Sequence, residues 1–136
     1  VPAAQSLGLG ILPWSPLGRG VLTGKYRHST PADSRGGNAD TASWIQVYQD
    51  ERCRRIVDAV ATAAEGLGCS PTEVSIAWLR DRPGVVAPIL GPRTTSQLVA
   101  ALAAEELELP EEILIALDDV SAPPMGYPEA GWAQRR

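Results

Sequence analysis

The sequence predicts an α/β fold in which short parallel strands alternate with helices. Residues 9–14 and 85–90 are apolar runs bounded by glycine and proline, which is typical of strands buried on both faces. The 70 residues between them carry helical patterns, and strands separated by helices favour parallel pairing. Two strands alone would expose unpaired edges, so the chain is expected to form part of a larger sheet.

Helix start and stop signals divide the rest of the chain. Capping residues and apolar periodicity predict a helix end over residues 2–7 and four further helices, which begin at Asp50, Ser70, Thr95 and Pro110. The helix from Thr95 is expected to bury Leu98, Ala101 and Leu102, and the last one Ile113, Leu114 and Leu117. Residues 27–43 read as a long surface loop of the kind that often serves as a functional lid. Residues 121–136 read as an irregular tail anchored by Tyr127 and Trp132.

Composition narrows the class of protein. The 136 residues form one domain, 1–136, or part of one, with 44% hydrophobic residues, a net charge of −4 and a pI near 4.9. The acidic balance argues against a nucleic-acid or membrane-surface partner, and no apolar run is long enough to span a bilayer. No signal peptide is visible, and Cys53 and Cys69 fit no disulfide framework, so a cytoplasmic protein is expected.

The most informative stretch follows the second predicted strand. Gly91 and Pro92 end that strand, and Thr94 with Gln97 has the spacing of a capping box for the next helix. Arg93 is thereby placed beside a helix N-terminus, where free backbone N–H groups and the helix dipole favour an anion. This indicates a phosphate site, and the alternative is an ordinary turn with a solvated arginine.

The other patterns in the sequence say less about a ligand site. The glycines at 18, 20 and 24 match neither a dinucleotide fingerprint nor a P-loop in spacing, and they are expected to form flexible turns. His28 has no ligand partner at metal-binding spacing and is expected on the surface, so no metal site is predicted. Trp14, at the exit of the first strand, could pack in the core or offer a stacking platform for a planar ring.

Three ordered blocks resemble the aldo-keto reductase family. Residues 14–26 (WSPLGRGVLTGKY) are similar to the segment after that family's seventh strand. Ala77-Trp78-Leu79, then Pro88 to Arg93 with Gln97-Leu98, resemble its later helix, eighth strand and final barrel helix. Leu117-Asp118 and Tyr127-Pro128 resemble its C-terminal extension. The resemblance implies the C-terminal portion of a (β/α)₈ TIM barrel, too short to close the barrel alone.

The resemblance also implies an oxidoreductase that reduces aldehydes and ketones with NADPH. Trp14 would stack on the nicotinamide, and the backbone of Ser15, Leu17 and Gly18 would face the pyrophosphate. Gly91 and Arg93 match the site of the adenosine 2′-phosphate, and Gln97 the adenine side. The family often has asparagine four residues after this glutamine, on the adenine side, whereas this chain has Ala101.

The family's catalytic Asp, Tyr, Lys and His come from earlier strands, and no matching set occurs in this sequence. The chain is therefore expected to be a C-terminal fragment that is inactive by itself, with no catalytic residue of its own. Two alternatives stay open, namely a non-catalytic module that binds a nucleotide or a partner protein, and an inactive truncated product.

Overall fold

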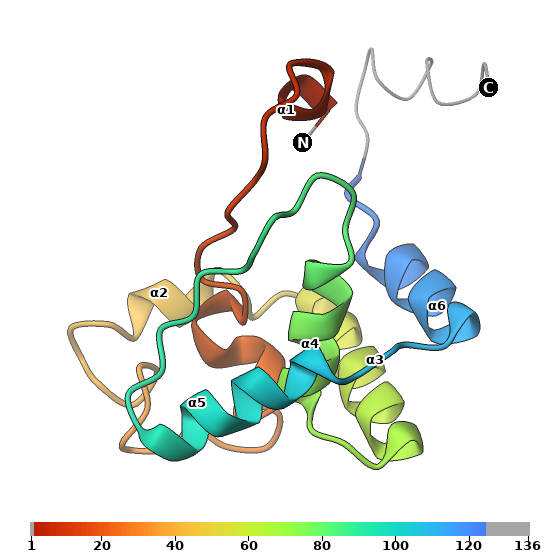
Figure 1. The fold of residues 1–136 in the computed structure, drawn as a ribbon. Coiled ribbons are helices and arrows are strands. Elements are labelled where there is room, and N and C mark those ends of the chain that lie inside the picture. The colour runs from red at the N-terminus through yellow and green to blue at the C-terminus, as the bar shows by residue number, and fades with distance from the viewer. Residues whose placement is uncertain (1, 125–136) are drawn as a thin grey trace.

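The computed structural model describes residues 2–124, and most of its helices gather in one layer (Figure 1). The helical elements, in chain order, are α1 (Pro2–Ser6), the 3-10 element η1 (Gly18–Thr23), α2 (Ser43–Gln46), α3 (Glu51–Leu67), α4 (Pro71–Arg80), α5 (Thr95–Leu102), η2 (Ala103–Glu105) and α6 (Glu111–Ser121). One extended segment joins α1 to η1, and a second rises from the end of α4 and returns to α5, while α1 stands apart from the other helices (Figure 1).

The ends of α3 and α4 follow the predicted capping signals. The Asp50 carboxylate accepts the N–H of Cys53 at 2.6 Å, and Gly68 ends α3 in the left-handed conformation, with φ of 67°. Ser70 and Glu73 form a complete capping box. The Ser70 hydroxyl accepts the Glu73 N–H at 3.2 Å, and the Glu73 carboxylate accepts the Ser70 N–H at 2.8 Å. These two helix starts are confirmed.

The main core lies where α4 and α6 pack against α3. Val74 and Ala77 of α4 are completely buried there, together with Ala64 of α3 and Leu117 of α6. Burial of Leu117 is confirmed, while Ile113 and Leu114 are only partly buried at its margin. The Arg52 guanidinium of α3 also donates to the carbonyl of Ser121 at 2.6 Å, which ties the end of α6 to the start of α3. The helix layer is therefore held by both apolar contact and end-to-end hydrogen bonds.

The two predicted strands pair in parallel, but only through two isolated bridges, Ile11 with Val85 and Trp14 with Ile89. The prediction of continuous strands over 9–14 and 85–90 is wrong. Pro13 and Pro88 have no N–H to donate, so the ladder is interrupted at both. Two residues separate the bridges on the first segment and three on the second, as in a β-bulge.

Several side chains predicted to be buried are exposed. The extended segments leave Leu12 57% and Val86 69% exposed, so they are not covered on both faces as expected. On α5, Ala101 is buried as predicted, but Leu98 is 37% and Leu102 55% exposed. Helical periodicity identifies the side chains that share a face, but it does not tell whether another element covers that face.

The loops and the tail agree with the sequence in part. Residues 27–42 form turns and bends without a regular element, as predicted, and α2 begins at the end of that loop. The region predicted as a glycine-rich loop contains η1. Ser121 still belongs to α6, so the irregular stretch begins one residue later than predicted, and Tyr127 and Trp132 lie outside the described residues. Within residues 2–124, no helix combines the length and the apolar character needed to cross a bilayer.

Candidate cofactor site

The parallel bridge between Trp14 and Ile89 places the exits of the two extended segments at one edge. Carboxyl ends of parallel strands share an edge, and ligands of α/β proteins commonly bind there. Leu17, in the turn after Trp14, and Leu90, just before Gly91, both pack against one small cluster. That cluster consists of buried side chains from α4, α5 and η2, namely Ile76, Ala101 and Ala104. The structure thus brings together the two motifs that the sequence singled out.

The turn after Trp14 has an unusual backbone. Ser15 and Arg19 have positive φ values of 54° and 59°, and Gly18 and Gly20 between and after them have 53° and 92°. Such left-handed conformations cost free energy in residues other than glycine and often occur at ligand sites. Within the turn, the Gly18 N–H donates to the Ser15 carbonyl at 2.9 Å, and the Arg19 N–H to the Ser15 hydroxyl at 3.3 Å. These two hydrogen bonds within the turn stabilise its conformation. A phosphate that faces Gly18 would share one of these N–H donors with Ser15 or take it over.

Arg93 is held differently from the capping box that the sequence predicts. The Thr94 hydroxyl does accept the Gln97 N–H, at 3.3 Å, so Thr94 caps α5. The side-chain amide oxygen of Gln97, however, accepts the backbone N–H of Arg93 at 2.8 Å rather than that of Thr94. The reciprocal half of the box is therefore wrong by one residue, and the amide oxygen of Gln97 is engaged with the backbone of Arg93.

The Arg93 side chain reaches a partner that sequence reasoning missed. Its guanidinium donates to the backbone carbonyl of Asp33 at 3.2 Å, across 60 residues of chain. Asp33 lies in the long loop that the sequence marked as a potential lid, and the length of that loop was the available signal. One contact uses only a fraction of the five N–H donors of a guanidinium, so Arg93 retains donors for an anion.

Trp14 and Gly91 are both open to solvent. Trp14 is 73% exposed, so the interpretation of Trp14 as a core residue is wrong and its ring faces are accessible. A side-chain atom added at Gly91 would meet nothing within 4 Å, so space adjoins the backbone there. Ala101, in contrast, is 7% exposed and packs in the small cluster with Ile76 and Ala104. Trp14, Gly91 and Arg93 are thus accessible to a ligand, whereas Ala101 is not.

Titratable side chains outside this edge that have shifted pKa values include Cys53, Cys69 and Tyr26. Burial raises the pKa of both Cys53 and Cys69, which favours the protonated thiol over the reactive thiolate. Burial also raises the pKa of Tyr26, but hydrogen bonds from Ser34 and the Gly36 N–H and the nearby Lys25 ammonium outweigh it. The net pKa of this phenol is lower than usual.

The described residues contain no group of three or more His, Cys, Asp or Glu side chains that could hold a metal ion, and His28 is exposed.

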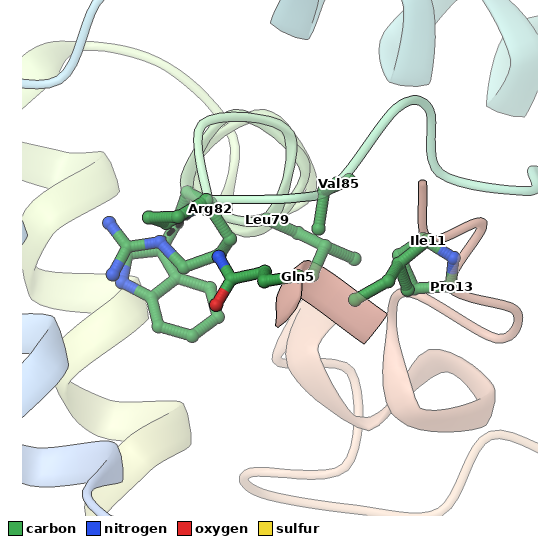
Figure 2. Close-up of a pocket in the computed structure, with 8 residues that line it drawn as sticks. Gln5, Ile11, Pro13, Leu79, Arg82 and Val85 are labelled. Atoms are coloured by element: carbon green, nitrogen blue, oxygen red, sulfur yellow. Dashed lines mark hydrogen bonds between the residues drawn. The ribbon is translucent and has the colours of Figure 1, made fainter. Parts of the chain in front are cut away.

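A pocket of about 380 Å³ lies between α1, the first extended segment and the end of α4 (Figure 2). Its lining is mainly apolar and includes Ile11, Leu79 and Val85. None of the seven predicted cofactor residues lines it, so this pocket is separate from the edge that carries Trp14 and Arg93.

Comparison with known proteins identifies the family of this chain. Residues 1–122 match the profile of the Aldo/keto reductase family. The chain belongs to that family. Aldo/keto reductases are expected to fold as (β/α)₈ barrels, and the helical layer with one parallel pair described above is compatible with part of such a barrel. Membership also assigns the chain to a family of oxidoreductases.

Relatives within the family differ in their assigned roles. An uncharacterized oxidoreductase of Bacillus subtilis, YrpG, is 37% identical over 96% of this chain and 38% of its own length. A proposed voltage-gated potassium channel subunit beta of Schizosaccharomyces pombe is 33% identical over 88% of the chain and 36% of its own length. Protein tas of Escherichia coli is 32% identical over 86% and 33%. The chain thus spans between 33% and 38% of the length of these three relatives.

Proposed function

We propose that this chain supplies the cofactor-binding C-terminal part of an NADP-dependent aldo-keto reductase. In this proposal residues 1–136 contribute the last two strands of a (β/α)₈ barrel, and residues 121–136 follow as a tail. The bound NADPH would supply a hydride to the carbonyl carbon of an aldehyde or ketone. The observation that carries the proposal is the parallel bridge between Trp14 and Ile89, because it sets the nicotinamide and phosphate motifs at one edge.

Each proposed cofactor residue has a chemical reason. The exposed indole of Trp14 offers a face on which the nicotinamide ring can stack. The Ser15–Gly18 turn, with Leu17, presents backbone to the pyrophosphate, and Gly91 leaves room for close approach. The Arg93 guanidinium would bind the 2′-phosphate and so favour NADP over NAD. The amide nitrogen of Gln97 is the group left to face adenine, since its oxygen is bound to Arg93.

We further propose that the catalytic acid comes from outside these 136 residues. The family's Asp, Tyr, Lys and His set has no counterpart in the motifs of this sequence, and the matched relatives are more than twice as long. A whole reductase would then be a cytoplasmic protein whose earlier strands protonate the carbonyl oxygen. A reading frame upstream of Val1 that lacked these four residues in barrel order would contradict this proposal.

Calorimetric titration of the chain with NADP⁺ and NAD⁺ tests the cofactor assignment. We expect Arg93→Ala to weaken NADP⁺ binding about 10- to 100-fold, because charge-assisted hydrogen bonds to the 2′-phosphate are lost. NAD⁺ lacks that phosphate, so its affinity should not change. Arg55→Ala removes the same charge from an exposed position on α3 and serves as the matched control. Equal binding of the two cofactors by the unmodified chain would refute the role of Arg93.

A second candidate is a non-catalytic module that binds the nucleotide or a partner protein. One relative is described as a channel subunit rather than as an enzyme, and the extended pair exposes Leu12 and Val86. NADP⁺ binding without reduction of any of a panel of aldehydes and ketones by the full-length product would favour this candidate. An inactive truncated product would bind neither cofactor.

A further inference from the structure

The loop after η1 is folded tightly around the hydroxyl of Tyr26. This hydroxyl accepts the backbone N–H of Gly36 at 3.1 Å, ten residues further along the chain. A side-chain carbon added at Gly36 would lie 2.8 Å from Cε1 of the Tyr26 ring and 3.0 Å from the Thr30 methyl carbon. The ring and the loop backbone are therefore in direct contact, and only glycine fits at position 36 without displacing one of them.

Ser34 closes the same loop from the inside. Ser34 is 4% exposed, which is unusual for a serine in a long surface loop. Its N–H donates to the Pro31 carbonyl at 3.0 Å, and its hydroxyl accepts the Gly37 N–H at 3.2 Å. The segment from 31 to 37 is thus a small folded unit with internal hydrogen bonds, and Tyr26 ties it to the residues that follow η1.

The same unit holds Arg93. The carbonyl that accepts the Arg93 guanidinium belongs to Asp33, the residue directly before Ser34. A guanidinium on a flexible side chain loses rotational freedom when it binds a phosphate, and a partner that already restricts it lowers that cost. The backbone carbonyl also takes up one N–H and leaves the others available.

We propose that Tyr26 is a positioning residue for Arg93: by fixing the 31–37 loop it holds the Asp33 carbonyl where it orients the Arg93 guanidinium for the 2′-phosphate of NADP. The proposal rests on the proposed function for the identity of the phosphate. Tyr26 acts through the loop backbone and through Asp33, and it contacts no ligand itself.

Two matched pairs of variants test this role. Tyr26→Phe removes the hydroxyl that accepts the Gly36 N–H. Tyr48→Phe is its control, because Tyr26 and Tyr48 line the same cavity of about 610 Å³ and only the Tyr26 hydroxyl bonds to the loop. Gly36→Ala displaces the loop and leaves the Tyr26 hydroxyl intact. Gly66→Ala is its control, since an added carbon there meets nothing within 4 Å.

The first measurement needs no cofactor. The {¹H}–¹⁵N heteronuclear NOE of the Arg93 Nε–H group reports how rigid this side chain is, and its signal is assigned by its loss in Arg93→Lys. We expect a lower value in Tyr26→Phe and in Gly36→Ala, and an unchanged value in Tyr48→Phe and Gly66→Ala. An Arg93 side chain that is equally rigid in Tyr26→Phe and the unmodified chain would overturn the proposal.

The second measurement is the dissociation constant for each cofactor. Tyr26→Phe and Gly36→Ala should weaken NADP⁺ binding about three- to tenfold and leave NAD⁺ binding unchanged. Equal weakening of both cofactors would indicate a general structural role and would contradict positioning of Arg93. If the unmodified chain binds neither cofactor, the proposed function fails. The NOE measurement then decides separately whether Tyr26 orders Arg93.

Discussion

The helix layer and the paired extended segments both carry apolar side chains, yet these side chains differ sharply in burial. In the layer, Val74 and Ala77 have no exposed surface. In the pair, Leu12 is 57% and Val86 69% exposed. Helices α3 and α4 of that core begin at side-chain caps, whereas the pair has only two bridges.

The difference reflects how each kind of element satisfies its backbone. A helix forms its hydrogen bonds within itself, so local signals such as Asp50 or the Ser70–Glu73 box are enough to start it. A strand depends on neighbours on both sides, and two segments provide one neighbour each. The same chain therefore contains a region determined largely by local sequence and another that depends on pairing and cover.

The largest expected effect is the loss of stability when an aspartate is introduced into each of the two regions. Val74→Asp should lower the free energy of unfolding by more than about 3 kcal/mol, because the carboxylate would be buried without a partner. Val86→Asp makes the same change at an exposed valine and should cost less than about 0.5 kcal/mol. Urea unfolding followed by circular dichroism measures both. A similar cost at the two positions would mean that the pair is covered in solution.

A smaller effect compares two helix caps. Ser70→Ala should destabilise the chain by about 1 kcal/mol or somewhat more, because the Glu73 N–H at the half-buried start of α4 loses its acceptor. Thr94→Ala at the exposed start of α5 should cost about 0.5 kcal/mol. The same urea experiment compares them. If Thr94→Ala proved the more damaging, α5 would contribute more to the folded core than its exposed leucines suggest.

The smallest effect concerns pH and the joint between α4 and α6. Hydrogen bonds from the Arg82 guanidinium, at 2.7 and 2.9 Å, hold the pKa of Asp118 below its ordinary value, and the Trp78 indole N–H adds to this at 2.7 Å. A carboxyl with a lowered folded pKa stabilises the fold above its unfolded pKa. This contribution disappears as the pH falls through the folded pKa. The Asp118 side chain is 48% exposed, and solvent screens the ion pair, so the loss should stay below about 1 kcal/mol.

Thermal melts from neutral to acidic pH measure this dependence. Asp118→Asn should make the melting temperature fall less steeply as the carboxyl range is crossed, and it should lower stability mainly at neutral pH. Asp119→Asn, which removes the neighbouring carboxylate, is the control. Parallel pH curves for the unmodified chain and Asp118→Asn would exclude a contribution from this network.

The predictable parts of the fold are those encoded locally. The starts of α3 and α4, the end of α3 at Gly68 and the burial of Leu117 all follow from caps and periodicity. The parallel direction of the pair was also predictable from the helices between its members. The missing N–H donors of Pro13 and Pro88 were readable in the sequence, whereas the unequal number of residues between the two bridges was not.

The candidate site was predictable in its motifs and not in its contacts. The sequence identified Arg93 and Trp14 from their places after apolar runs, and the bridge at Ile89 brings their segments together. The bond from Arg93 to Asp33 joins residues 60 apart, and it depends on how a loop without periodic pattern folds. The choice of Gln97 between the N–H groups of Arg93 and Thr94 depends on backbone angles that the spacing alone does not determine.

The backbone N–H and C=O groups of the first extended segment point alternately to its two sides, and this affects how copies of the chain can associate. Ile11 and Pro13 turn their carbonyls towards the second segment. Gly10, Leu12 and Trp14 therefore direct their N–H and C=O groups to the opposite side. None of these three is proline, so that side keeps its donors and acceptors and can template another strand. At high concentration, copies of the chain can associate by pairing these edges. The substitution Leu12→Lys is the simplest change that would oppose this association.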